Sequence, residues 1–344
     1  MPLTPQTDLA RYIQEKCGEN VCLCYQCQKC TAGCPVAEHF DLMPNQVVRA
    51  AQFDQKEFIL NSKTVWLCAA CEACSTRCRQ GIDITRVMDV LKIMAQREGI
   101  EPGVRTVPMF YKSGLRSIKL FGRVYELELM RELYLRRLLA GELDIGQFFL
   151  GDLPLAMKMV RRGKLRLLPT RPSDQPTKGV AYYPGCSLHS TAIEYNLSTK
   201  AIAERLVLSA AEGVRFDLAE PKGWACCGTT PAHSTDDLLA TIMPLKNLKL
   251  IEESGYSCVA MPCPSCFIRH RTAIYDVRDD PGLRGQVAAL RLGSGQARMR
   301  QTPSEEIEVE HLLTTFTKRV GYDAIAEAVT QPLTGLKWSV TMAV

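Results

Sequence analysis

Two cysteine runs with one shared spacing constrain the fold of this 344-residue chain more than any other feature. Each run reads C-x2-C-x2-C-x3-C, and the eight positions are Cys24, Cys27, Cys30 and Cys34, then Cys68, Cys71, Cys74 and Cys78. Structural zinc sites, the alternative, favour two short cysteine pairs held apart by a longer loop. Three thiolates at successive three-residue steps instead fit three corners of an iron–sulfur cube. The repeat therefore predicts two 4Fe–4S clusters.

The fourth cysteine of each run is expected to bind the cluster of the other run, as is usual for this spacing. Cluster one is then held by Cys24, Cys27, Cys30 and Cys78, and cluster two by Cys68, Cys71, Cys74 and Cys34. Crossed ligation of this kind ties the two runs together. Pro35 follows the first run, but Arg79 stands at the usual proline position after the second.

The rest of residues 1–103 has a helical pattern. Pro44 suits a first helical turn, and an amphipathic helix is expected to end at Gly99. Its apolar positions are Val87, Val90, Leu91 and Met94. No strand-like alternation occurs there, so we expect a helical ferredoxin-type domain with two clusters. Cys17 and Cys22 fall outside the spacing and are interpreted as free small hydrophobes near the cluster rather than ligands.

Composition indicates an ordinary globular protein, with 46% hydrophobic and 23% charged residues. Sixteen cysteines among 344 residues are too few for a short disulfide scaffold. The N-terminus has no apolar signal-peptide region, and no apolar run reaches the length of a transmembrane helix. The sequence therefore predicts a cytoplasmic protein whose thiols are reduced, a setting where clustered cysteines bind metal or do redox chemistry.

A cysteine-free, basic helical connector is expected over residues 104–169. Residues 104–168 hold thirteen Lys or Arg against six Asp or Glu, a balance of +7, whereas the whole chain carries +5. This surface is either a docking face for an acidic partner or a solvated face. Aromatic residues do not interleave with the basic ones, so nucleic acid is not expected. The Pro- and Gly-containing segment 170–179 is predicted to be a linker.

The second group of cysteines lies where strands are predicted to end. Cys186 follows the apolar run GVAYYPG, and Cys263 and Cys266 follow a run that ends at Met261, each before a helical segment. Loops at strand ends of a parallel sheet converge, so an α/β domain is expected. Adjacent Cys226 and Cys227 need an irregular turn to face one site, and the glycine that follows them permits one. Cys258 is interpreted as a core residue.

The full cysteine pattern resembles the cysteine-rich CCG domain of heterodisulfide reductases and related iron–sulfur oxidoreductases. Thirty-nine residues separate Cys186 from Cys226, and thirty-five separate Cys227 from Cys263. The N-terminal runs, CYQCQKCTAGCPV and CAACEACSTRC, resemble the C-type subunit of heterodisulfide reductase, as does RRGKLRLLP at 161–169. The resemblance covers nearly the whole chain and implies an α+β protein: a helical ferredoxin-type domain followed by an α/β CCG domain at 180–333.

The resemblance also implies that five cysteines hold a noncubane 4Fe–4S cluster at which a disulfide is cleaved or formed. They are Cys186, Cys226, Cys227, Cys263 and Cys266. An ordinary cubane on four of the five, or zinc, remains an alternative. The family's B-type subunit usually carries the CCG motif twice, but this chain has one copy, and residues 334–344 resemble the start of a second half. Either a partner supplies that half, or the chain is truncated, or one copy suffices.

We therefore expect a fused C-plus-B-type subunit of a heterodisulfide reductase-like complex of anaerobic metabolism, a hetero-oligomer with oxidoreductase activity. Two cubanes would conduct electrons to the CCG cluster for disulfide reduction or thiol oxidation. The alternative is a pure electron relay between a flavoprotein dehydrogenase and a membrane quinone module. No Walker loop and no GxGxxG after a strand occurs, so a flavin is expected on an A-type partner subunit. For His189 and His233, hydrogen bonding is favoured over proton donation.

Overall fold

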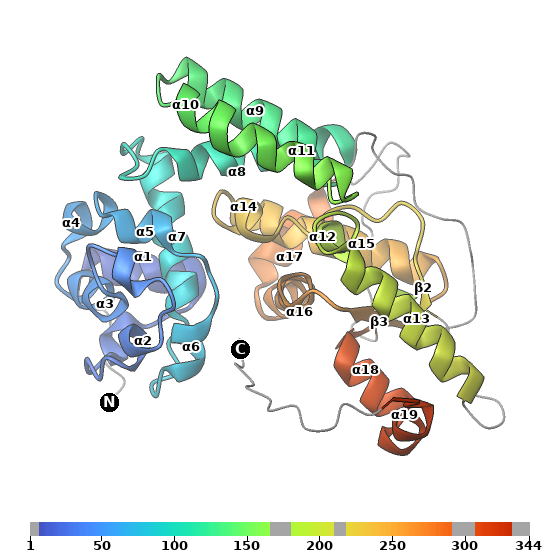
Figure 1. Ribbon diagram of the computed structural model, residues 1–344. Helices are drawn as coiled ribbons and strands as arrows, with labels where there is room; N and C mark the ends of the chain where they lie inside the picture. The colour runs from blue at the N-terminus through green and yellow to red at the C-terminus, as the bar shows by residue number, and fades with distance from the viewer. Residues whose placement is uncertain (1–6, 166–179, 210–217, 291–306, 332–344) are drawn as a thin grey trace. The chain divides into compact units, whose positions relative to one another are not determined.

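The computed structural model describes residues 7–165, 180–209, 218–290 and 307–331 (Figure 1). Contacts divide the chain into two compact units. Among these residues, unit 1 comprises 7–112 and Thr230–Asp236, and unit 2 comprises the described parts of Ser113–Thr229 and Asp237–Leu336. The predicted linker at 170–179 and the predicted start of a second CCG half at 334–344 lie outside the described residues.

The described part of unit 1 contains helices and no strand, as expected. Its principal helices are α1 (Asp8–Cys17), α3 (Pro44–Gln52), α4 (Lys56–Leu60), α5 (Lys63–Leu67) and α7 (Ile84–Arg97), with short α2 (Lys29–Ala32) and α6 (Ala73–Arg77) inside the cysteine runs. Figure 1 shows α1, α4 and α5 gathered around α7, which contacts each of them. Helix α14 (Thr229–His233) begins at the unit boundary, and α8 (Thr106–Phe121) crosses it.

Local sequence explains where the unit 1 helices begin and end. Pro44 occupies the first turn of α3, where its missing N–H costs nothing. The Asp83 side chain accepts a hydrogen bond from the amide of Arg86 and so caps α7. The apolar face predicted for α7 is buried, with Val87 and Leu91 fully enclosed. The chain then turns at Gly99, whose φ of 68° is left-handed, close to the predicted end.

The described part of the basic connector is helical as well. It continues from α8 through α9 (Glu126–Leu139), α10 (Ile145–Gln147), a π turn at Phe148–Asp152 and α11 (Leu153–Arg161). Some of the basic residues of the connector are neutralised by acidic residues of the same helix. Arg131 donates two 2.7 Å hydrogen bonds to Glu128, and Arg136 lies 2.6 Å from Glu132. Both glutamates are buried, so α9 is not exposed on all sides.

The core of unit 2 is a parallel sheet. Its strands are β1 (Val180–Tyr182), β2 (Leu218–Ala219), β3 (Cys258–Met261) and β4 (Glu308–His311), in the order β2-β1-β3-β4. The remaining helices are α12 (Gly185–Leu188), α13 (Ile193–Ser209), α15 (Asp237–Glu253), α16 (Pro264–Asp279), α17 (Pro281–Ala289), α18 (Leu312–Arg319) and α19 (Tyr322–Ala328).

Helices cover both faces of this sheet. One apolar cluster joins Val259 and Met261 to residues of α15 and α16, and a second joins Ala260 to α13 and α18. Parallel strands buried on both faces require such cover. The predicted α+β class, with an α/β second domain, is confirmed. In the described ranges, no helix combines the length and apolarity that crossing a bilayer would need.

Candidate metal centres

The two N-terminal cysteine runs adopt the same unusual backbone conformation. Gln26 and Gln28 have φ of 63° and 61°, and the equivalent Ala70 and Glu72 have φ of 50° and 61°. Left-handed backbone is uncommon for residues other than glycine and gathers at functional sites. The sequence repeat is therefore also a structural repeat, with each run folded into the same turns before its short helix.

The structure brings the two runs against each other. Helices α2 and α6 are in contact. Burial raises the pKa of Cys34, and the charge of Cys71 raises it further. The amide of Lys29 lowers the pKa of Cys27, with a smaller contribution from Arg79, the neighbour of Cys78. Each run thus lies within electrostatic reach of the other, which is the arrangement that crossed ligation needs.

Polar groups surround several of the predicted ligand sulfurs. The Gln26 amide lies 3.3 Å from Cys24 Sγ, and the Thr85 hydroxyl lies 3.7 Å from Cys74 Sγ. Burial raises the pKa of Cys68 to about 11, while the nearby charge of Lys92 opposes the rise. A buried sulfur that resists ionisation in the free thiol is stabilised as thiolate by a bound cation, so this donor set fits iron.

No sequence motif includes Lys92, yet its side chain is fully buried beside Cys68. Burial lowers the pKa of Lys92, but the charges of Asp89, Tyr111 and Cys68 raise it by more, and the net shift is upward. The only sequence signal for this buried cation is a lysine on the otherwise apolar face of a predicted helix. Cys17 is partly buried and packs against the same core, as expected, and burial raises its pKa to about 12.

The five C-terminal cysteines come together in unit 2. Cys186 lies in α12 after β1, Cys226 and Cys227 lie in the loop after β2, and Cys263 and Cys266 lie at the start of α16 after β3. Cys227 Sγ is 3.4 Å from Cys266 Sγ. Further side-chain contacts join Cys186 to Cys226, Cys226 to Cys227, and Cys263 to Cys266. The predicted convergence of loops at the strand ends is confirmed.

Two glycines make this convergence possible. Gly228 has φ of 84°, so the predicted irregular turn after the cysteine pair is confirmed, and its amide donates to Cys226 Sγ at 3.5 Å. Gly185 has φ of 76°, and a Cβ there would lie 2.9 Å from Cys266 Sγ. Only a residue without a side chain allows Cys266 to approach the backbone beside Cys186.

Contacts among the thiols shift their pKa values in opposite directions. Hydrogen bonds from Cys226 and Cys266 lower the pKa of Cys227, and a hydrogen bond from Cys266 lowers the pKa of Cys263 to about 6. The corresponding bonds, together with burial, raise the pKa of Cys266 well above its ordinary value. Five sulfurs in contact cannot all be thiolates without positive charge between them. An iron–sulfur cluster supplies that charge, so the residues fit the group.

A polar frame that the sequence did not predict holds the Cys226-Cys227 loop. The Tyr183 hydroxyl donates to the carbonyl of Ala225 at 2.6 Å, and the Asn247 side chain accepts from the Ala225 amide at 2.8 Å. The amide of Cys226 donates to the carbonyl of Gly122, in the turn between α8 and α9, at 2.8 Å. These contacts join residues far apart in sequence, so no local pattern signals them.

The histidines near the sites each lie against a carboxylate. His189 Nε2 lies 3.0 Å from Glu220 Oε1, and Glu220 also accepts from the Trp224 indole at 2.8 Å. His233 Nδ1 lies 2.7 Å from Asp89 Oδ2. Neither ring is needed to explain the gathering of thiols.

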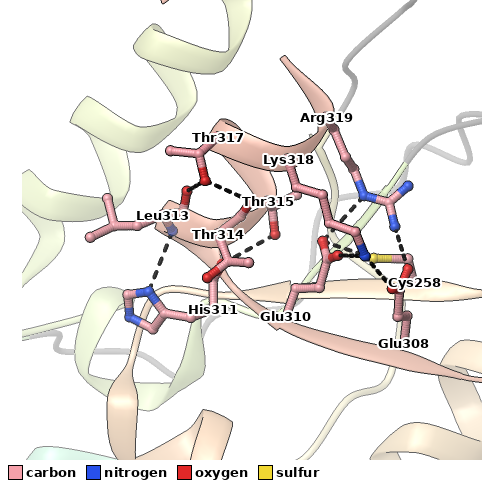
Figure 2. A network of polar contacts seen from close by, with 10 residues as sticks. All are labelled: Cys258, Glu308, Glu310, His311, Leu313, Thr314, Thr315, Thr317, Lys318 and Arg319. Atoms are coloured by element: carbon pink, nitrogen blue, oxygen red, sulfur yellow. Dashed lines mark hydrogen bonds and ion pairs between the residues drawn. The ribbon is translucent and has the colours of Figure 1, made fainter. Parts of the chain in front are cut away.

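Cys258 is a core residue, as expected, although two carboxylates lie beside it (Figure 2). Its Sγ is 3.5 Å from Glu310 Oε2, and Glu308 completes a group whose donor atoms could reach one cation. Both carboxylates are already paired with Lys318 and Arg319, at 2.9 and 3.2 Å for Glu310. Their negative charge is neutralised from within the protein, and burial raises the pKa of Cys258 to about 12.

Comparison with known proteins agrees with these two regions. Residues 23–83 match a 4Fe-4S dicluster domain family, and residues 180–269 match a cysteine-rich domain family of CCG type. These two regions of the chain are therefore similar to an iron–sulfur dicluster domain and to a CCG domain, and the resemblance expected from its cysteines is confirmed.

Curated relatives match parts of the chain. The C-type subunit of a ferredoxin:CoB-CoM heterodisulfide reductase from Methanosarcina mazei is 32% identical over 87 residues, 25% of this chain and 53% of the relative. Its counterpart from Methanosarcina acetivorans is 36% identical over 77 residues, which are 22% of this chain and 31% of the relative. The 8-methylmenaquinol:fumarate reductase membrane anchor subunit of Wolinella succinogenes is 31% identical over 163 residues, which are 47% of this chain and 51% of the relative. The chain spans about half the length of these relatives, or less.

Proposed function

We propose that this chain is an iron–sulfur electron-transfer subunit of heterodisulfide reductase type, in which two cubanes pass electrons to a noncubane cluster at the CCG site. There a disulfide is reduced, or two thiols are oxidised in the reverse direction. The observation that carries the proposal is the meeting of five thiols from three loops, since one cubane needs only four.

The electron balance of the reaction suits two one-electron carriers. Cleavage of a disulfide consumes two electrons and two protons and yields two thiols. Each 4Fe–4S cluster of the dicluster domain transfers one electron at a time, so cluster one and cluster two together match the demand. When bound, the CCG-site cluster would supply iron positions that hold a substrate sulfur between the two electron transfers.

The residues of this chain would position and enclose that chemistry. Tyr183 is fully buried beside the CCG thiols, and with Asn247 it fixes the loop that carries Cys226 and Cys227. Trp224 packs 4.7 Å from the Tyr183 ring. The apolar rings exclude water from the buried thiols, Cys226, Cys227 and Cys266, and so strengthen the electrostatic interactions of the thiolates.

The proposal includes partners. Electrons would come from a flavin-containing A-type subunit or another donor, because neither a Walker loop nor a dinucleotide fingerprint occurs in the sequence. A second CCG half, if the reaction requires one, would be supplied by another subunit. The protein would act in a hetero-oligomeric complex of anaerobic metabolism in the cytoplasm.

A second candidate is a relay without substrate chemistry. The relative from Wolinella succinogenes matches 163 residues and is named as a membrane anchor subunit of a quinol:fumarate reductase. In that role the CCG site would pass electrons between a flavoprotein dehydrogenase and a quinone module.

One assay separates the two candidates. The anaerobically reconstituted chain, alone and with its partner subunits, is supplied with a reduced viologen, and disulfide loss is followed. Catalysis at the CCG site predicts turnover with partners present, and Cys227→Ala should abolish it while both cubanes remain reducible. If no assembly of the wild-type chain reduces any disulfide, the catalytic proposal is wrong and the relay is favoured.

A further inference from the structure

A fully buried cation lies next to one of the predicted ligands of cluster two. Lys92, in α7, has no exposed surface, and its Nζ lies 3.4 Å from the carbonyl oxygen of Cys68. The ring of Tyr111 lies 5.6 Å away on another side. A buried ammonium group is costly unless charges or dipoles compensate it. Lys92 therefore differs from an ordinary surface lysine, and its position beside a predicted cluster ligand suggests an electrostatic role.

Asp89, the nearest acid, only partly neutralises Lys92. Its Oδ1 lies 3.9 Å from Lys92 Nζ, beyond hydrogen-bond distance, and among the described residues this oxygen has no hydrogen-bond partner. The other oxygen, Oδ2, lies 2.7 Å from His233 Nδ1. An ionised carboxylate only accepts, so the imidazole donates from Nδ1. His233 thus holds the carboxylate, and Lys92 lies closer to the Cys68 carbonyl than to its counter-ion.

The segment that supplies His233 is fastened to α7 at more than one point. Ser234 Oγ lies 3.2 Å from Lys92 Nζ, and the Gln96 side chain donates to the Ser234 carbonyl. Residues Thr230–Asp236 accordingly belong to unit 1, although they follow the Cys226-Cys227 pair in the chain. Asp89 and Lys92 are therefore held in a defined geometry rather than left free to pair with each other.

We propose that Lys92 and Asp89 set the reduction potential of cluster two, Lys92 raising it and Asp89 lowering it, with His233 as the residue that positions the carboxylate. The proposal rests on the proposed ligation of cluster two by Cys68, Cys71, Cys74 and Cys34. Reduction adds one negative charge to the cluster, so a nearby positive charge stabilises the reduced form and a nearby negative charge opposes it. Burial weakens screening by solvent and makes both effects large.

Opposite signs separate this electrostatic role from a merely structural one. Lys92→Met removes the cation and should move one of the two cubane potentials in the negative direction. Asp89→Asn keeps the shape, removes the anion and should move the same potential in the positive direction. His233→Ala releases the carboxylate toward Lys92 and should again move it in the negative direction. Damage to the fold would not produce opposite shifts from neighbouring substitutions.

The experiment is a redox titration of the full-length, anaerobically reconstituted chain, with the two cubanes followed by electron paramagnetic resonance. For Lys92→Met we expect at least a tenfold change in the reduced-to-oxidised ratio at a fixed poise, about 59 mV for a one-electron couple. Lys56→Met is the control, because that half-exposed lysine of the same unit pairs with Glu98 at 2.6 Å. It should leave both potentials unchanged.

The experiment distinguishes failure of this inference from failure of the proposed function. If cubane signals are intact but Lys92→Met and Asp89→Asn move the potential in the same direction, or by no more than the control, this inference is overturned alone. If Lys92→Met fails to take up clusters, the sign of the Asp89→Asn shift decides. If the wild-type chain holds no cubane at all, the proposed function and this inference are overturned together.

Discussion

Replacing Gly185 with alanine tests the packing of the CCG site most sharply. The left-handed backbone at this position, φ of 76°, costs a residue with a side chain roughly 1–2 kcal/mol. The new Cβ would also lie 2.9 Å from Cys266 Sγ and 3.8 Å from Cys263 Cβ, and relief of such overpacking typically costs about 1–3 kcal/mol. We therefore expect Gly185→Ala to lower the free energy of unfolding of unit 2 by roughly 2–5 kcal/mol.

Gly255 provides a matched control within the same unit. Its φ of 84° carries the same backbone penalty, but among the described residues, its chain neighbours aside, no atom lies within 4 Å of the Cβ position. Gly255→Ala should therefore cost only about 1–2 kcal/mol. The change in unfolded-chain entropy is common to both variants, so their difference isolates the contact with Cys266.

The assay is urea unfolding of the reconstituted chain, followed by circular dichroism, with iron measured on the same samples. Gly185→Ala should be less stable than Gly255→Ala by about 1–3 kcal/mol. It should also lose iron, because Cys266 is displaced from the other thiols. Equal stability and equal iron content in the two variants would refute the close approach of Cys266 to Gly185 as a requirement of the site.

Three further tests concern other parts of the structure. Cys34→Ser should remove the resonance signal of the cluster built on Cys68, Cys71 and Cys74, and loss of the Cys24 cluster alone would contradict crossed ligation. Glu310→Gln should lower stability by about 1–3 kcal/mol at neutral pH, because Lys318 and Arg319 lose their buried negative partner and one of its two accepting oxygens. Glu308→Gln, at a half-exposed position, should cost less than about 1 kcal/mol. Burial raises the pKa of Glu310, but those two cations lower it by more, so its folded pKa lies below the ordinary 4.5. The stabilisation is then complete above pH 4.5 and is lost as the pH falls through the folded pKa, and the Glu310→Gln difference should shrink in acid thermal melts. A difference that persists unchanged at acid pH would show that packing, not charge, is responsible. Cys227→Ala should abolish disulfide turnover and leave both N-terminal cubanes reducible, whereas unchanged turnover would exclude Cys227 from the reaction.

Much of this architecture follows from local sequence signals. The cysteine spacing, the Pro44 helix start, the apolar face of α7 and the strand–loop–helix around Cys186 each rest on a few neighbouring residues. Predictions from such patterns are confirmed because they depend on hydrogen bonding and burial within a single helix, strand or turn. The turn at Gly228 was predictable for the same reason, since two adjacent cysteines that serve one site require it.

The contacts that sequence reasoning missed all join distant segments. The Gly122 carbonyl that accepts from Cys226, the Asn247 side chain that holds Ala225, and the Asp89–His233 pair have sequence separations that no periodicity encodes. The burial of Lys92 was not predicted for a different reason. A charged residue inside an apolar pattern normally indicates an exposed position, so the pattern gave no sign that this lysine is buried. Its role depends on which atoms surround it, and only the tertiary structure supplies them.

The central claim is that the five CCG thiols bind an iron–sulfur cluster in addition to the two cubanes of the dicluster domain. The most direct test is determination of iron, acid-labile sulfide and zinc in the chain purified and reconstituted without oxygen. Two cubanes and one noncubane cluster predict about twelve irons per chain and no zinc. About eight irons, with or without one stoichiometric zinc, would confine iron–sulfur chemistry to the N-terminal runs and contradict the claim.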